Sequence, residues 1–248
     1  MYKLTHPDGF DFYSSTINYR EAIGTTIRIK DYEPKDFGVC GRGLHASKNP
    51  NDCFVGAKIP CAAFHVEGVN KIAGDKVKTR YQGLKIIEEI TDLDELFGWN
   101  YSEAINLINP FKIKAPEVDE NVLQLLKEWN SVYNSIKSSI CSSVCISAYH
   151  SVYRYGWSSI RTSVWDSVRN LIWHSAEEPV YAYIGSLFPN IKKWESFKHK
   201  KGVYPFQSGA DLWKMGFVPS FNGKVWRLHI GRNAKVVWEG GIKFDLKS

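Results

Sequence analysis

The chain has 248 residues and a formal net charge of +6, and its 44% hydrophobic and 23% charged residues are typical of an ordinary globular protein. This length can bury a sizeable core and allows one large or two small domains. The mild positive charge favours anionic partners only weakly, and alone it falls short of a nucleic-acid-binding signature.

The sequence predicts a cytoplasmic protein. It contains no run of about 18 or more apolar residues, which excludes a membrane-spanning helix. Residues 1–6 lack the apolar core of a secretion signal. The five cysteines, an odd number, show no paired framework, which fits a reducing compartment better than a disulfide scaffold. We therefore expect no membrane partner.

Residues 1–115 have the pattern of a mixed α/β domain with short strands and turns. The most compact motif is Cys-Gly-Arg-Gly-Leu-His-Ala-Ser at 40–47, whose two glycines predict tight backbone or positive φ just before a short strand. Further strands are expected at 2–5, 25–29, 62–66 and 84–90, and one or two short helices at 93–109. Two X-Pro pairs, Asn109-Pro110 and Ala115-Pro116, mark the linker that follows.

The motif at 40–47, together with the turn at 50–52 and the strand at 64–67, resembles an uncharacterised family of microbial and phage proteins. Proteins of that family often carry Ser-Val tetrad arrays after such a domain. They also share an ending like Asp211–Lys214 and Trp226–His229 of this chain. The resemblance covers most of the chain. It implies a phage or mobile-element context and no established activity.

A second resemblance points to an enzyme. The strand at 41–46 is similar to the Gly-x-Gly-hydrophobic-Tyr-Phe-Ala strand of ADP-ribosyltransferases, with His45 where that family has tyrosine. The resemblance implies an NAD site with one residue on an early strand and a glutamate on a late strand. By position, the catalytic candidates beside His45 are His6 or Thr5, and Glu88 or Glu89.

Other chemistries find less support. His65-Val66-Glu67 has the His-x-Glu form of zinc deaminases, but the Pro-Cys-x-x-Cys ligand pair is missing, and Cys141-x-x-x-Cys145 has the wrong spacing. We expect no metal site. Cys40 with His45 or His65 would form a thiol nucleophile pair, which requires proximity in space. We favour a purely structural motif, in which the glycines serve the turn and His45 bonds within the loop.

The stretch from Ser131 to Ala176 repeats every four residues. Serine opens most tetrads and a small aliphatic residue follows it, although Tyr155 and Leu171 replace serine in two of them. An α-helix advances about 100° per residue, so a stripe with this period drifts by about 40° per tetrad and cannot stay on one partner. Valine, isoleucine, serine and aromatic residues are also weak helix formers.

The repeat therefore favours a β-solenoid scaffold over residues 117–190, in which stacked tetrads bury a continuous core. Helical caps are expected at both ends, around 118–129 and 180–188. The alternative is two or three ordinary helices, broken near Tyr155-Gly156 and Pro179, in which serine allows close packing.

Residues 191–248 begin with a basic segment that contains aromatic residues. Exposed lysines with aromatic faces suit phosphate contact and base stacking, and a solvated linker is the alternative. The candidate nucleic-acid-binding residues of the segment are Lys192, Lys193, Trp194, Lys198, Lys200 and Lys201. A helix at 208–214 and a three-stranded meander should follow. The meander contains an Asn222-Gly223 turn and adds Arg227 and Arg232 to the basic candidates.

The sequence thus predicts an α+β protein in three parts, with boundaries at 1–115, 117–190 and 191–248. Our leading expectation is a phage- or mobile-element-type interaction module that binds nucleic acid or a host protein, without catalysis and without a cofactor. The alternative is an ADP-ribosyltransferase-like enzyme that uses NAD.

Overall fold

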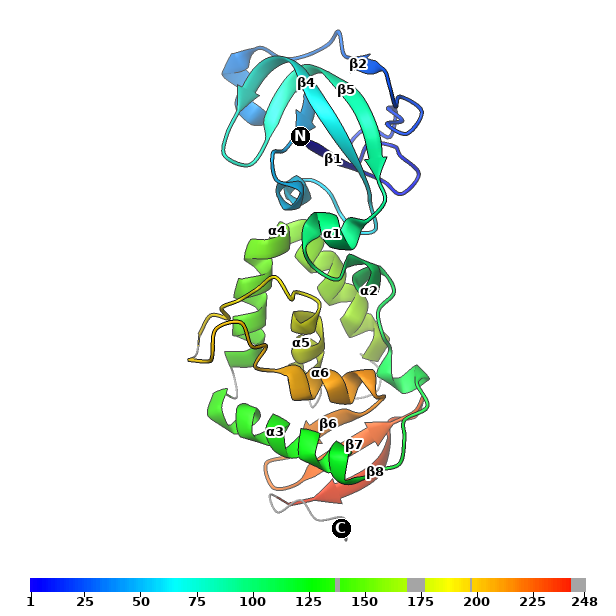
Figure 1. The fold of residues 1–248 in the computed structure, drawn as a ribbon, viewed down its shortest axis with the longest axis vertical. Helices are drawn as coiled ribbons and strands as arrows, with labels where there is room; N and C mark the ends of the chain where they lie inside the picture. The colour runs from blue at the N-terminus through cyan, green and yellow to red at the C-terminus, as the bar shows by residue number, and fades with distance from the viewer. Residues whose placement is uncertain (137–138, 169–176, 197, 242–248) are drawn as a thin grey trace. The chain divides into compact units, whose positions relative to one another are not determined.

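Figure 1 shows the fold in a computed structural model, which describes residues 1–136, 139–168, 177–196 and 198–241. The predicted α+β class is confirmed by an N-terminal antiparallel sheet, central helices and a C-terminal meander. Two compact units are present, an N-terminal unit (Met1–Ile105 with Ser151–Ser159) and a C-terminal unit (Asn106–His150 with Ile160–Ser248). Within the described ranges, no helix is both long and apolar enough to cross a membrane.

The sheet of the N-terminal unit is antiparallel and is dominated by two long strands, β4 and β5 (Figure 1). The strand order is β1-β4-β5-β2, and the short β3 also pairs with β5. The turn between β4 and β5 is closed by Asp75, whose carboxylate accepts hydrogen bonds from the backbone amides of Val77 and Lys78. The strands are β1 (Tyr2–Thr5), β2 (Thr26–Arg28), β3 (Leu44–Ala46), β4 (Ala62–Gly74) and β5 (Thr79–Ile90).

One face of this sheet carries the apolar core, with Phe64 and Val66 of β4 beside Leu84 and Ile86 of β5, all fully buried. Tyr19, from the loop before β2, packs against Phe64. A second, aromatic cluster follows the sheet and joins Phe54, Phe97, Trp99 and Tyr101. Four short helices complete the contiguous part of the unit: η1 (Lys35–Cys40), η2 (Pro50–Val55), α1 (Leu93–Phe97) and α2 (Tyr101–Ile105).

The β-solenoid favoured from the tetrad repeat is wrong, because the described part of the repeat is helical. It forms the end of α3 (Glu120–Ile136) and all of α4 (Ser139–Val168). On α3 the aliphatic tetrad positions Val132 and Ile136 are half-buried. Six such positions on α4 are fully buried: Ile140, Val144, Ala148, Val152, Ile160 and Val164. The last tetrads, with Leu171, Trp173 and Ser175, lie outside the described residues.

The division of α4 explains how a helix accommodates a winding stripe. Val152 belongs to the N-terminal unit, whereas Val144 and Val164 belong to the C-terminal unit. The helix is also bent, because Cys141 and Arg161 both meet Tyr181 of the helix at 177–186, although twenty residues of a straight helix would hold them about 30 Å apart. The stripe therefore lies on two arms of α4 (Figure 1), and no single partner has to follow the drift of about 40° per tetrad. Ser143 and Ser147 are buried beside the aliphatic positions, as expected where small residues allow close packing.

In the C-terminal unit, α6 (Gln207–Lys214) packs against α3 and against α5 (Glu177–Ser186) (Figure 1). The helical segments predicted on both sides of the repeat correspond to α3 and α5. Trp213 of α6 stacks on Tyr183 of α5, with ring centroids 5.4 Å apart, and its indole N–H donates to the carbonyl of Ile108. The short η3 (Pro110–Lys112) precedes these helices in the chain.

The predicted C-terminal meander is confirmed as three antiparallel strands, β6 (Val218–Phe221), β7 (Trp226–Ile230) and β8 (Lys235–Gly240). The connection between β6 and β7 has four residues, 222–225, and only Gly223 in it has a positive φ, of +95°. It is therefore not the two-residue type I′ turn that Asn-Gly favours, and the side-chain oxygen of Asn222 instead accepts from the backbone amides of Lys224 and Val225. Trp226 is buried, and its indole N–H donates to the side-chain oxygen of Asn130 on α3. The meander is thereby anchored to α3.

Candidate functional site

The predicted catalytic residues do not converge on one site. His45 lies on β3 directly opposite Arg80, near the start of β5. Glu88 lies eight positions further along β5, which corresponds to about 26 Å at the usual rise of a strand. His45 therefore shares no site with Glu88 or Glu89, and the arrangement implied by the resemblance to ADP-ribosyltransferases is not formed.

The two glutamates also face opposite sides of the sheet. Glu89 lies opposite the buried Phe64, whereas the exposed Glu88 lies opposite His65. Arg20 holds both oxygens of Glu89, with its Nη2 2.5 Å from Oε1 and its Nε 2.7 Å from Oε2. These hydrogen bonds lower the pKa of Glu89, so this carboxylate is a structural ion-pair partner.

The two candidate histidines have structural contacts of their own. His6 lies just beyond β1 and packs on the ring of Phe12, with centroids 4.3 Å apart. The Nε2 atom of His45 lies 2.8 Å from the carbonyl oxygen of Val39, to which it donates. Burial lowers the pKa of His45 to about 4, so the ring is neutral at physiological pH. The hydrogen bond from His45 to Val39 thus connects β3 to η1.

Cys40, His45 and His65, which the suggested thiol–histidine pairs would use, each contact a different partner. The Sγ atom of the exposed Cys40 lies 3.7 Å from the Nζ atom of Lys78. His45 bonds to Val39, and the Nδ1 atom of His65 faces Glu88 at 3.6 Å. Both imidazoles are therefore directed to partners other than Cys40.

The low pKa of His45 predicts a pH-dependent stability. A neutral, buried histidine binds a proton more readily in the unfolded chain, so its contribution to stability is complete above about pH 6.5 and is lost as the pH falls towards 4. Between pH 7 and pH 5 the wild type should lose about 2 kcal/mol more of its unfolding free energy than His45→Gln. Urea denaturation at both pH values measures this difference. Equal losses in the two proteins would contradict it.

The glycine motif at 40–47 surrounds a buried arginine from a different part of the chain. Arg80 is fully buried, and its guanidinium donates to the backbone carbonyls of Glu33 and Arg42, both at 2.9 Å, and of Pro34 at 2.7 Å. A Cβ atom at Gly41 would lie 2.4 Å from Arg80 Nη1, and one at Gly43 would lie 2.4 Å from its Cγ. The glycines make room for this side chain, and neither has a positive φ.

The described residues of the predicted basic segment form a surface loop, which we call the lysine loop (residues 192–196 and 198–201). Its five lysines, Lys192, Lys193, Lys198, Lys200 and Lys201, are all exposed. The loop is closed by a hydrogen bond of 2.8 Å from the backbone amide of Gly202 to the carbonyl of Lys192. The Nε2 atom of His199 accepts a hydrogen bond from the backbone amide of Trp194 at 2.8 Å, and this bond joins two residues of the loop.

Trp194 does not have the exposure that base stacking requires. Its side chain is only 1% exposed and packs on Tyr204, with ring centroids 4.9 Å apart, and on Phe206. Trp194 therefore anchors the lysine loop to the rest of the C-terminal unit. The other aromatic residue of the segment, Phe197, lies outside the described residues.

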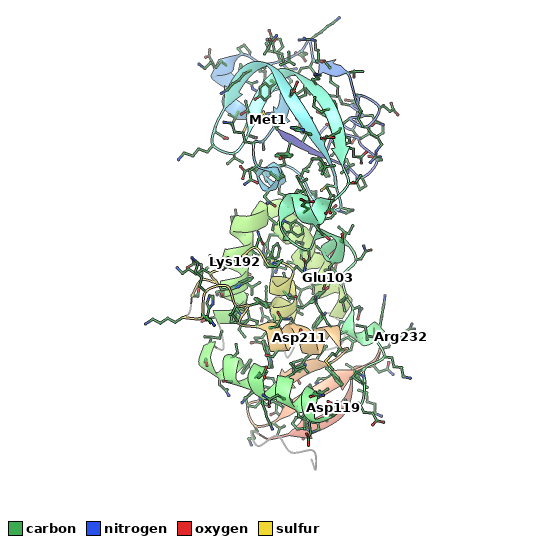
Figure 2. The ribbon with its side chains drawn as sticks, in the orientation of Figure 1. Met1, Glu103, Asp119, Lys192, Asp211 and Arg232 are labelled. Atoms are coloured by element: carbon green, nitrogen blue, oxygen red, sulfur yellow. The ribbon has the colours of Figure 1, made fainter. Side chains whose placement is uncertain are left out.

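The two arginine candidates lie away from the lysine loop. Arg227 on β7 pairs with Glu239 on β8, so its charge is already compensated. Arg232 is exposed between β7 and β8. Figure 2 shows Lys192 and Arg232 on opposite flanks of the C-terminal unit. The eight predicted nucleic-acid-binding residues therefore do not form one continuous face.

A reactive cluster that sequence reasoning missed lies on α4. Cys141 and Cys145, the thiol pair, have their Sγ atoms 3.8 Å apart. Tyr181 of α5 hydrogen-bonds to Cys141, and the Nε atom of Arg161 donates to the Tyr181 hydroxyl at 3.1 Å. The i, i+4 spacing was the available signal, but it predicts proximity only once the segment is known to be helical.

The thiol pair is electrostatically asymmetric. The hydrogen bond from Cys145, assisted by Tyr181, lowers the pKa of Cys141 to about 6. The pKa of Cys145 is raised, first by its hydrogen bond to Cys141 and then by burial. Burial also raises the pKa of Tyr181, which therefore remains a protonated phenol. One proton is thus shared between two sulfur atoms, beside a phenol and a guanidinium.

Two features of the C-terminal unit can act on a partner, namely the lysine loop by charge and the thiol pair by sulfur chemistry. Within the described parts of the chain, no group of three or more His, Cys, Asp or Glu side chains is arranged to hold a metal ion. No family model, no curated protein and no solved structure matches this chain, so its function has to be argued from its own residues.

Proposed function

We propose that the protein is a non-catalytic interaction module that binds nucleic acid through the phosphate backbone, with the lysine loop as the contact surface. The observation that carries this proposal is the exposure of all five lysines on one closed loop. A phage or other mobile-element context remains part of the proposal and rests on the sequence resemblance described above.

The charge balance of the loop supports an anionic partner. One glutamate, Glu195, accompanies the five lysines, and its Oε1 lies 3.8 Å from Nζ of Lys193. Lys192 donates to the carbonyl of Pro189 at 2.7 Å, which leaves its positive charge uncompensated. An exposed ion pair at such a distance contributes little, so the loop carries a net positive field into solvent.

The geometry favours phosphate contacts over base recognition. Lysine presents a flexible point charge, which suits phosphate oxygens, and phosphate contacts carry no sequence information. Trp194 is buried and so supplies no stacking surface. We therefore expect binding that is largely independent of sequence and strongly weakened by salt.

Neutralising the lysine loop should reduce both affinity and salt dependence. In a triple variant, three loop lysines become glutamine: Lys198→Gln, Lys200→Gln and Lys201→Gln. If each contacts one phosphate, the slope of log K against log salt for duplex DNA should become shallower by about 3, and affinity at about 0.1 M salt should fall roughly 10- to 100-fold. Fluorescence anisotropy with labelled duplex DNA, duplex RNA and single strands measures both quantities.

A matched control removes the same charge from the N-terminal unit, where three lysines are also exposed: Lys30→Gln, Lys35→Gln and Lys58→Gln. It should retain the affinity and the slope of the wild type. An equal loss in both triple variants would show a response to net charge alone and would reject the lysine loop as the site. A wild type that binds no nucleic acid would overturn the proposal in favour of a host-protein partner.

A further inference from the structure

The thiol pair places two soft ligands side by side on one helix. Cys141 and Cys145 are both half-buried and both free thiols, and their Sγ atoms are 3.8 Å apart. They are one turn apart on α4, so the helix itself fixes their separation. Such a pair can close into a disulfide or chelate a thiophilic ion, and the geometry distinguishes the two.

The helix opposes a disulfide. Side chains at i and i+4 have Cβ atoms about 5–6 Å apart on a regular helix. A relaxed disulfide needs Cβ atoms about 3.5–4.5 Å apart and sulfur atoms about 2.05 Å apart. Closing this bond between Cys141 and Cys145 would require the backbone of α4 to distort. The sulfurs are therefore held near one another without reaching bonding distance.

The same spacing suits an ion between the two sulfurs. At about 2.3 Å per metal–sulfur bond, a linear S–metal–S unit needs a sulfur separation of about 4.6 Å, less than 1 Å beyond the present 3.8 Å. Small rotations about the Cα–Cβ bonds provide this change without moving the helix.

The number of ligands selects the kind of ion. Zinc takes four ligands in structural sites, or three with an open position in catalytic sites. Over the described residues, no third His, Cys, Asp or Glu joins the pair in such a group. Thiolates prefer soft ions, and the univalent d¹⁰ ions Cu(I) and Ag(I) are satisfied by two ligands in a line.

Nearby groups suit the charge of such a complex. With one univalent ion bound, both sulfur atoms are thiolates, and the bis-thiolate unit has a charge of −1. Arg161, whose Nε donates to the Tyr181 hydroxyl at 3.1 Å, supplies a positive charge on the same side of the pair. The Tyr181 proton is free to point at sulfur, because its oxygen accepts from Arg161. We propose that Cys141 and Cys145 form a two-thiolate site for Cu(I), with Arg161 and Tyr181 as its outer partners.

The test is an anaerobic titration with Cu(I), buffered by a chromophoric chelator and followed by the ultraviolet sulfur-to-copper charge-transfer band. The wild type should take up one tightly bound Cu(I) per chain. Groups behind the ligands typically change metal affinity about 10- to 100-fold, so Arg161→Gln should weaken binding about 10-fold. Loss of a ligand in Cys141→Ser or Cys145→Ser should exceed that range.

Cys40→Ser, which removes an exposed thiol from the N-terminal unit, is the matched control and should bind Cu(I) as the wild type does. Serine is nearly isosteric with cysteine, and circular dichroism verifies that each variant keeps its helices. A double Cys141→Ser/Cys145→Ser variant with wild-type affinity would overturn the proposal. So would rapid formation of a Cys141–Cys145 disulfide under mild oxidation, detected by mass spectrometry, because the helix would then not hold the sulfurs apart.

Discussion

Replacing Arg80 by methionine should lower the unfolding free energy of the N-terminal unit by about 3–5 kcal/mol. The guanidinium is fully buried and satisfies three backbone carbonyls of the segment 33–42. Methionine matches its apolar stem but donates no hydrogen bond, so these carbonyls must either stay unsatisfied or take the segment into water. Hydrogen exchange in denaturant, read by mass spectrometry on peptides from β4 and β5, reports on the unit that contains the substitution.

A substitution at Gly43 tests the contact between the glycine motif and Arg80 from the glycine. Gly43→Ala places a Cβ atom 2.4 Å from Arg80 Cγ and should cost about 1–3 kcal/mol, as overpacking usually does. The control is Gly56→Ala, because a Cβ atom there meets nothing within 4 Å. The double variant Gly43→Ala/Arg80→Ala should be more stable than the sum of the single effects, since alanine at position 80 lacks the Cγ and Cδ atoms that the new Cβ meets. Equal effects of Gly43→Ala and Gly56→Ala would contradict this role of the motif.

The glycine motif illustrates what local sequence can predict. The spacing of Gly41 and Gly43 predicted tight backbone or positive φ before a short strand. The strand is β3, but neither glycine has a positive φ, and what is tight is the space beside them. The cause of the tightness, however, is Arg80, which lies almost forty residues further along the chain. Only the pairing of β3 with β5 brings them together, and no local pattern reveals that pairing.

The tetrad repeat shows where local propensity misleads. Its residues are weak helix formers, and its four-residue period drifts around a helix, so both signals opposed a helix. Tertiary packing outweighs propensity in most protein helices. Here Val144 and Val152 are both buried but belong to different units, a division that the repeat itself does not encode. Reading the repeat as a solenoid also hid the thiol pair, because Cys141 and Cys145 adjoin only on a helix.

The C-terminal meander was predictable because its signals are local. Asn222-Gly223 indicates a turn between two strands, although the connection that forms has four residues, and the flanking segments are rich in strand-forming residues. The role of Trp194 was not predictable in the same way. An aromatic residue among lysines has the same sequence pattern whether it faces solvent or core, and only its contacts with Tyr204 and Phe206 decide the matter.

A substitution at Gly209 should be among the most destabilising in the C-terminal unit. Gly209 lies within α6, where it approaches the indole of Trp129 on α3. A Cβ atom would lie 2.6 Å from two carbon atoms of that ring and 3.1 Å from the Cβ of Ala182. Trp129 is fully buried, so the ring has no solvent into which to move.

Two effects oppose each other at this position. Alanine in place of glycine within a helix gains about 1 kcal/mol of propensity, whereas overpacking a filled core costs about 1–3 kcal/mol. Valine loses most of the propensity gain and adds two methyl groups to the clash, so we expect Gly209→Val to cost about 3 kcal/mol. In a domain of this size the melting temperature should fall by roughly 6–12 °C. Differential scanning calorimetry measures the shift.

A smaller side chain at position 129 should reduce the loss of stability caused by Gly209→Val. Trp129→Leu removes ring atoms that the new side chain meets, so Gly209→Val should cost less in the Trp129→Leu background than in the wild type. Gly241→Ala is the control in the same unit, because a Cβ atom there meets nothing within 4 Å. If Gly209→Val is no more destabilising than Gly241→Ala, α3 and α6 do not approach as closely as the contact with Trp129 requires, and the packing of this unit must be reconsidered.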